Sequence, residues 1–364
     1  MKRLLAITLS VLLLLGSVAS VSAEANKKLS IVTTIFPQYD FSRQIVGDLA
    51  DVHMLLKPGA ESHTYEPSPQ DIKLIQSCDV FIITGGENDV WVDDILESMG
   101  DKKPLTLRLV DMVNTVDEVI VEGMEHEHHH DHDGHHEDAD HDHDHDEHHE
   151  DADHDHDEHH EDADHDHDHD HDHDHDHDDD HDHDHDHEAE VDEHVWTSPL
   201  NAMEIVRQLT AVYAAKDPAN AATYQKNSDA YLAELTKLDA SFREVVSSAK
   251  RDTLLFGDRF PFRYFADAYG LKYYAAFTGC STETEASAAT VAFLIDKTKD
   301  MGLPVVFTIE LSNGKIADSI CEATGAKRLT LYSCHNVTAD QMKDGVTYLS
   351  MMQENIESLK TALN

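Results

Sequence analysis

Short apolar runs rich in β-branched residues alternate with amphipathic stretches along most of this chain. The runs in the first part read LSIVTTIF, DVHMLL, DVFIITG and PLTLRLV, and those in the last part read TLLFGD, KYYAAF, PVVFTIE and KRLTL. Runs of this length and composition predict buried strands, and the stretches between them predict helices. Strands that alternate with helices form a parallel sheet flanked by helices. The pattern therefore predicts an α/β fold with two lobes.

The longest helical pattern, residues 217–250, separates the two sets of strands and has no Gly or Pro after Pro218. Its large apolar residues recur at spacings of three, four and seven, which marks one buried stripe: Tyr224, Tyr231, Leu235, Leu238, Phe242 and Val245. A helix of about 32 residues is roughly 48 Å long. It could join the two lobes as a rigid connection, although a surface helix of a single domain would show the same pattern.

Residues 125–190 interrupt this alternation with a tract that contains 27 His, 34 Asp or Glu, and no Lys or Arg. The tract has almost nothing to bury, so it is expected to be a disordered insert. Neutral imidazole and carboxylate are ligands that zinc and its neighbours prefer. Metal binding is therefore the chemistry that this composition predicts.

The N-terminus has the pattern of a secretory signal peptide, because Lys2 and Arg3 precede an apolar run that ends in small residues at Ala23. Cleavage after Ala23 would place the protein in the periplasm or elsewhere outside the cytoplasm, whereas an uncleaved segment would act as a membrane anchor. The predicted divisions are a signal peptide (1–23), an N-terminal lobe (24–124), the insert (125–190), the rest of the N-terminal lobe (191–216), the linker helix (217–250) and a C-terminal lobe (251–364).

Charge excludes some classes of partner. The formal net charge is −47, and the tract holds 34 of the 74 acidic residues, which leaves 40 against 27 basic ones. Nucleic acid and anionic membrane surfaces are therefore repelled, whereas metal cations are attracted. No nucleophile paired with a base and no phosphate-binding Gly-rich loop is apparent, so an enzyme is not expected.

Candidate metal ligands stand where parallel sheets place their sites, at the carboxyl ends of strands. His63 lies in the loop KPGAESHTYEPSP after the second strand, and His194 follows the tract directly in DEHVWTSP. Asp258 and Glu310 end two strands of the second lobe. A lone His or acid at such a position is more often structural, but the adjacent tract favours a metal role for His63 and His194.

The four cysteines are Cys78, Cys280, Cys321 and Cys334. An oxidising compartment permits a disulfide, but spacing alone does not decide which two would pair. The absence of a CxxC or CxxxC motif argues against a zinc site made of thiolates, so we expect these cysteines to be structural or free.

The motifs GAESHTYEPSP, HVWTSP after a His-rich insert, DPANAATYQKNSDAYLAEL and RYFADAYGL together resemble a known family. They are similar to the zinc- and manganese-type solute-binding proteins of bacterial metal ABC transporters, and the resemblance extends from Leu29 to the C-terminus. It implies two α/β lobes joined by a long rigid helix, with one metal ion in the cleft between them. The first two motifs supply one ligand each, here His63 and His194.

The resemblance also implies further site residues. The third ligand of relatives is usually a His or Glu at the position that Arg259 occupies here, and Arg cannot bind a cation. Asp258 could take that role through a shift of one residue. The fourth ligand varies in the family, and Glu310 and Glu61 are the candidates. Some zinc-binding relatives carry a disulfide in the second lobe, which by position would join Cys280 and Cys334.

The function that the resemblance implies is capture of Zn²⁺ in the cleft and its delivery to the permease and ATPase subunits of a metal ABC transporter, with the chain acting as a monomer. Mn²⁺ or Fe²⁺ is the alternative cargo, because carboxylate-rich sites accept these ions. The insert would collect metal weakly and raise its concentration near the cleft. A metal buffer that acts through the tract alone is a different reading, and an adhesin has no independent support in the sequence.

Overall fold

The structure, a computed structural model, describes residues 27–61, 65–86, 89–124, 190–282 and 285–364. The predicted signal peptide, His63 and nearly all of the predicted insert lie outside these residues. The described residues before and after the insert belong to one compact unit. Within the described residues, no helix has both the length and the apolar character that a membrane span requires.

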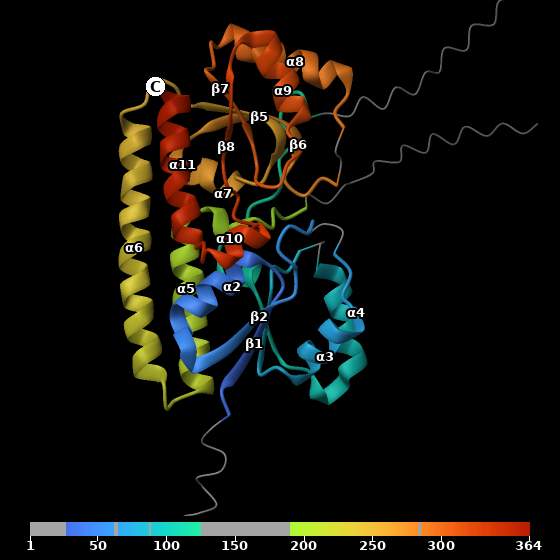
Figure 1. Ribbon diagram of the computed structural model, residues 1–364, viewed down its shortest axis with the longest axis vertical. Helices are drawn as coiled ribbons and strands as arrows, with labels where there is room; N and C mark the ends of the chain where they lie inside the picture. Colours follow the sequence, from blue (N-terminus) through green and yellow to red (C-terminus); the bar gives the residue numbers. More distant parts are fainter. Residues whose placement is uncertain (1–26, 62–64, 87–88, 125–189, 283–284) are drawn as a thin grey trace, which may run out of the picture. The chain divides into compact units, whose positions relative to one another are not determined.

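The first lobe is built on a four-stranded parallel sheet, as the alternating pattern predicts (Figure 1). Side chains on β1 alternate between its two faces, so Ile31 packs towards α2 and Val32 packs towards α3 and α4. The strands in spatial order are β2 (Ala50–Met54), β1 (Leu29–Thr33), β3 (Val80–Ile83) and β4 (Leu105–Arg108). The helices are α2 (Phe36–Val46), α3 (Pro69–Ser77) and α4 (Val90–Met99).

The second lobe repeats this topology with a second parallel sheet. On β5, Phe256 packs towards α7 and α11, and its neighbour Leu255 packs towards α8 and α9. The strands in spatial order are β6 (Lys272–Thr278), β5 (Thr253–Phe260), β7 (Val305–Thr308) and β8 (Lys327–Thr330). The helices are α7 (Arg263–Tyr269), α8 (Ala288–Asp300), α9 (Lys315–Thr324), α10 (Ala339–Lys343) and α11 (Tyr348–Leu363).

The predicted long helix is α6 (Ala221–Ser247), and it packs along α5 (Pro199–Lys216) and α11 (Figure 1). All six apolar residues of the predicted stripe are buried on it, together with Ser228. The helix begins later than predicted because Asp217 caps the preceding turn, where its carboxylate accepts hydrogen bonds from Asn220 and from the Tyr224 hydroxyl, both at 2.7 Å. α6 contacts helices of both lobes, namely α2, α5, α7 and α11, as a connecting helix would.

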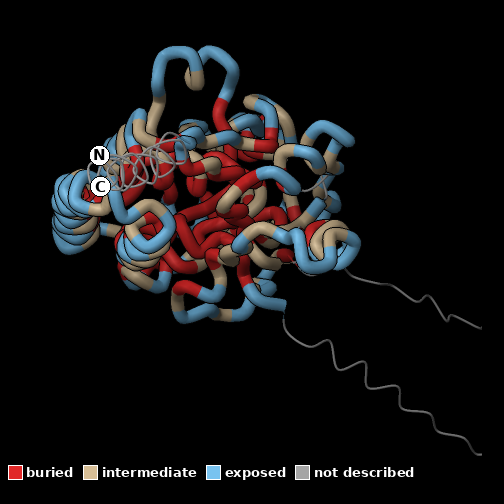
Figure 2. The backbone as a smooth tube through the Cα atoms, turned by 90° about the horizontal axis from the view of Figure 1, so that it is seen from below, coloured by how far each residue is buried: buried red, intermediate tan, exposed pale blue. Residues whose placement is uncertain are grey.

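The two lobes share one continuous cluster of buried apolar side chains that runs from β1 to α11. Figure 2 shows the buried segments gathered inside a layer of exposed ones. Loops at the carboxyl ends of the strands meet across the lobes: the backbone N–H of Gly59, after β2, donates to the carbonyl of Val337, after β8, at 2.8 Å. Ligands of parallel sheets bind at this edge, where the order of the strands reverses. The fold therefore places both sets of loops around one candidate site.

Candidate metal centre

His194 lies in the loop that follows the insert, immediately before the short 3-10 helix Val195–Thr197. Its side chain is almost fully buried, with 1% exposed. The Asp192 carboxylate accepts a hydrogen bond from the His194 backbone N–H at 2.8 Å and lies 3.1 Å from Nδ1 of the ring. A carboxylate on one ring nitrogen orients the imidazole and leaves the other nitrogen for a metal ion. The Tyr264 hydroxyl donates to the Asp192 carbonyl at 2.7 Å, which ties this loop to the second lobe.

The thiol of Cys280 contacts the His194 imidazole from the loop that follows β6. Gly279 permits this approach, because a Cβ atom at that position would lie 3.0 Å from Cε1 of His194. The Glu118 carboxylate accepts a hydrogen bond from the Cys280 backbone N–H at 3.0 Å. Burial by itself lowers the pKa of His194, but the interactions with Cys280 and Asp192 outweigh it and raise that pKa well above 6.5. The structure thus joins a thiol and an imidazole that are far apart in the sequence.

His335 is the residue that the sequence analysis missed. It lies in the loop after β8, and its ring centre is 5.5 Å from that of His194. Trp196 packs between the loops, with its ring 5.1 Å from His335 and 5.4 Å from His194. The indole N–H of Trp196 donates to the Ser333 carbonyl at 2.8 Å, which fixes the loop that carries His335. The available signal was its place at the carboxyl end of the last strand.

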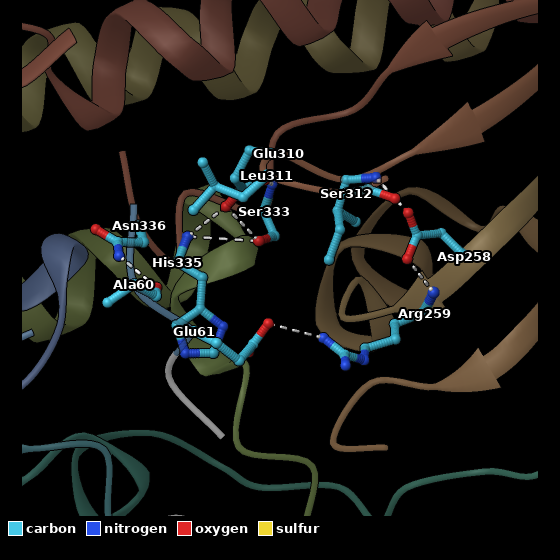
Figure 3. Close-up of a pocket in the computed structure, with 11 residues that line it drawn as sticks. Ala60, Glu61, Asp258, Arg259, Glu310, Leu311, Ser312, Ser333, His335 and Asn336 are labelled. Carbon is cyan, nitrogen blue, oxygen red and sulfur yellow. Dashed lines mark hydrogen bonds and ion pairs between the residues drawn. The ribbon is translucent and has the colours of Figure 1, made fainter. Parts of the chain in front are cut away.

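Glu310, a predicted ligand, holds the loop of His335 in place (Figure 3). One carboxylate oxygen accepts hydrogen bonds from the Ser333 hydroxyl and the His335 backbone N–H, and the other accepts one from the Ser333 backbone N–H, all at 2.7 Å. Burial raises the pKa of Glu310 although these hydrogen bonds oppose the shift. This loop requires such support because Cys334 adopts a left-handed backbone conformation, with φ 62°.

Replacement of Glu310 by glutamine should loosen this loop. Both carboxylate oxygens of Glu310 accept hydrogen bonds, whereas glutamine places an NH₂ group at one of the two positions. That donor would face another donor, so a buried hydrogen bond is lost at a cost of about 1–3 kcal/mol. We expect urea unfolding to show that loss and zinc titration to show an affinity lower by about 10–100-fold. Glu61→Gln is the control for stability, because Glu61 forms a half-exposed ion pair of little energetic weight. Equal destabilisation by both variants would contradict the role given to Glu310.

Asp258 and Arg259 lie where the pairing of β5 with β6 is irregular, between Phe256 and Arg259. The Asp258 carboxylate accepts hydrogen bonds from the backbone N–H groups of Arg259 at 2.9 Å and Ile309 at 3.3 Å. Burial raises its pKa. The Arg259 guanidinium reaches across to Glu61 at 3.3 Å (Figure 3). The residue at the position of the third ligand is therefore an ion-pair partner of the other lobe.

The loop that leads to His63 is anchored at residues 57–60, although His63 itself lies outside the described residues. The Asn336 side-chain amide donates to the carbonyls of Lys57 at 3.0 Å and Ala60 at 2.7 Å. Asn336 follows His335 directly, so the first predicted ligand loop and the loop of His335 are fixed to one another. A cavity lies at this junction and is lined by Glu61, Asp258, Arg259, Glu310 and His335 among others.

The expected disulfide between Cys280 and Cys334 is not formed, because all four cysteines are free thiols. The two residues have separate surroundings. Cys334 is fully buried in the main apolar cluster, with its sulfur 3.9 Å from the Tyr332 carbonyl. Cys280 instead faces His194. Cys334 agrees with the prediction of a structural cysteine, because it lies among apolar side chains, whereas the Cys280 thiol interacts with the His194 imidazole.

The donor atoms suit zinc, since imidazole and thiol nitrogen and sulfur atoms are its preferred ligands. They come from separate loops of both lobes, and buried carboxylates fix those loops. Among the residues that the structure describes, no group of three or more His, Cys, Asp or Glu side chains is already gathered closely enough to hold a metal ion. The described residues therefore form two pairs: His194 with Cys280, and His194 with His335.

Comparisons with known proteins agree with this architecture. The family model described as "Zinc-uptake complex component A periplasmic" matches residues 31–362. The high-affinity zinc uptake system protein ZnuA of Bacillus subtilis is 31% identical over 336 residues, which cover 92% of this chain and 88% of that protein. The zinc-binding lipoprotein AdcA of Streptococcus pneumoniae R6 is 29% identical over 360 residues, which cover 99% of this chain and 61% of that protein. The chain thus spans about three fifths of the length of this streptococcal relative.

A solved structure supports the same relationship. The Zn(II)-bound ZnuA-like domain of Streptococcus pneumoniae AdcA superposes with a TM-score of 0.64 at 26% sequence identity, and the match covers 92% of this chain and 99% of that one. The family model covers almost the whole of the described fold, from β1 to α11. The chain belongs to the ZnuA family, the periplasmic component A of zinc-uptake complexes.

Proposed function

We propose that this chain is an extracytoplasmic receptor that captures Zn²⁺ between His194 and His335 and delivers it to the permease and ATPase of an ABC transporter. The observation that carries the proposal is the distance of 5.5 Å between the two ring centres. With Zn–N bonds of about 2.0–2.1 Å and tetrahedral angles, two imidazoles on one zinc ion have ring centres about 5 Å apart. The two rings need only a small movement to share an ion.

His63 is proposed as a further ligand, on the basis of the resemblance and of the anchored loop that leads to it. Of the three candidate carboxylates, Glu61 is the one with the best case. Glu61 lines the same cavity as His335 (Figure 3), whereas Glu310 and Asp258 accept hydrogen bonds from neighbouring backbone N–H groups. The Arg259–Glu61 ion pair would have to open for Glu61 to bind the ion.

The insert at 125–190 is proposed to collect metal and raise its concentration near the cleft, since it rejoins the fold just before His194. Export through a signal peptide cleaved after Ala23 would place this collector where an uptake receptor operates. A metal buffer would also use the insert, but it would not need two imidazoles held on opposite loops. The positioned pair is the reason to prefer the receptor.

Competition between Zn²⁺ and Mn²⁺ tests the proposed cargo. Nitrogen and sulfur donors favour zinc, which also stands above manganese in the general order of affinities. Titration of the mature protein with each ion, and with both at equal concentration, should show zinc displacing manganese from the tightest site. Equal affinity for both ions, or displacement of zinc by manganese, would mean that carboxylates dominate the site and that the cargo is manganese.

A further inference from the structure

Asp192 and His194 are buried and Cys280 is partly buried, and the three form a series in which a carboxylate orients an imidazole and the imidazole contacts a thiol. Cys280 comes from the carboxyl end of β6 in the second lobe, and His194 comes from the loop that follows the insert. We propose that Cys280 is a ligand of the captured ion, binding as a thiolate to the same zinc as His194. This inference rests on the proposed function and adds a sulfur donor to its site.

The separation of the two groups fits a shared ion. Zinc bonds to sulfur at about 2.3 Å and to imidazole nitrogen at about 2.0 Å, so in a tetrahedral site the two donor atoms lie about 3.5 Å apart. A thiol hydrogen-bonded to an imidazole has a similar separation, and the structure pairs Cys280 with His194 in this way. When zinc binds, the S–Zn bond replaces the S–H bond and the thiol proton passes to solvent.

The surroundings keep the sulfur at this position. Gly279 lets the loop lie against the imidazole, since any Cβ there would be 3.0 Å from Cε1 of His194. The Glu118 carboxylate holds the Cys280 backbone N–H at 3.0 Å. On the His194 side, the ring of His335 lies 5.5 Å away, centre to centre. The thiol therefore contacts one imidazole of the His194–His335 pair, which distinguishes it from the cysteine buried among apolar side chains at 334.

The same thiol–imidazole–carboxylate arrangement activates nucleophilic cysteines in enzymes. The metal interpretation fits better because a second imidazole, that of His335, adjoins the first. A catalytic cysteine needs one imidazole as its base, whereas a metal ion can bind both imidazoles.

Cobalt spectroscopy tests the proposal on the full mature chain, because Co²⁺ substitutes for Zn²⁺ and reports its donors. One equivalent of Co²⁺ should produce visible bands of a tetrahedral site and an intense near-ultraviolet sulfur-to-cobalt charge-transfer band. The near-ultraviolet band should disappear in Cys280→Ser and persist in Cys321→Ser, which alters a partly exposed cysteine on α9. Circular dichroism checks that both variants fold. The cobalt spectrum of the wild-type protein tests for a sulfur ligand even if a variant does not fold.

Each outcome decides between the two proposals. Both bands in the wild type, with selective loss of the near-ultraviolet band in Cys280→Ser, support thiolate ligation. Visible bands without a charge-transfer band refute the role of Cys280 and leave the imidazole site intact. A charge-transfer band that survives in Cys280→Ser assigns the sulfur to another cysteine and also overturns the inference. The absence of both bands overturns the proposed cleft site itself.

Discussion

Replacement of His194 by alanine should abolish tight zinc binding. The imidazole is held by Asp192, contacts Cys280 and lies 5.5 Å from the ring of His335, so it is common to every pair in the site. We expect the affinity of the tightest site to fall by more than about 100-fold, beyond the 10–100-fold effect of losing an outer hydrogen-bond partner. Calorimetric titration of the mature protein with Zn²⁺ measures this directly, and the weak sites of the insert should be unchanged.

A matched control is His53→Ala, which removes an exposed histidine of β2 outside the insert. His194→Gln keeps a polar side chain beside the buried Asp192 carboxylate and separates loss of a ligand from loss of folding. The account predicts that both changes at His194 remove the tight site and that the change at His53 does not. Retention of tight binding in a folded His194→Gln variant would contradict it.

Replacement of Trp196 by alanine should cost the most stability of any change near the site. Trp196 has no exposed surface and packs against both histidines. Its indole N–H donates to the Ser333 carbonyl, and its own carbonyl accepts from the Tyr348 hydroxyl, both at 2.8 Å. Loss of a buried aromatic side chain costs about 3–5 kcal/mol. We expect urea unfolding, followed by circular dichroism, to show a loss of this size, together with weaker zinc binding because the His335 loop is released.

The control is Trp91→Ala, which removes the other tryptophan. Trp91 is partly buried and packs edge-on against Tyr65, with ring centres 5.6 Å apart. Its loss should cost less stability and leave the His335 loop in place. If the two variants lost equal stability and equal zinc affinity, Trp196 would have no special role in joining the loops.

The fold was predictable because its signals are local and periodic. The stripe from Tyr224 to Val245 is buried as predicted, and the two sets of apolar runs form two parallel sheets. The predicted start of the connecting helix, at Asp217, is four residues too early, since α6 begins at Ala221. Asp217 followed by Pro has the sequence pattern of a helix start, but its carboxylate instead accepts hydrogen bonds from Asn220 and Tyr224 in the turn before the helix. Local patterns identify elements, and side-chain hydrogen bonds set their ends.

The candidate site was predictable only in part, because its chemistry depends on contacts between distant loops. Asp258 lies near the end of β5 and Glu310 lies just after β7, and the hydrogen bonds that they accept from the backbone N–H groups of Ile309 and His335 could not be read from the sequence. His335 is recognised as a candidate ligand only from the structure, in which Trp196 packs against both His335 and His194. Cys280 has no closely spaced cysteine that would mark it as a ligand, since its partner is a histidine of the other lobe. These relationships cannot be read from spacing along the chain.

The central claim is that the tight site lies in the folded part of the chain and not in the His-rich tract. Deletion of residues 125–190, followed by calorimetric titration with Zn²⁺, tests it most directly. The account predicts one tight zinc site in the shortened protein, with loss of the weak sites that the tract supplies. Loss of all tight binding would contradict it and would identify the tract as the functional metal site.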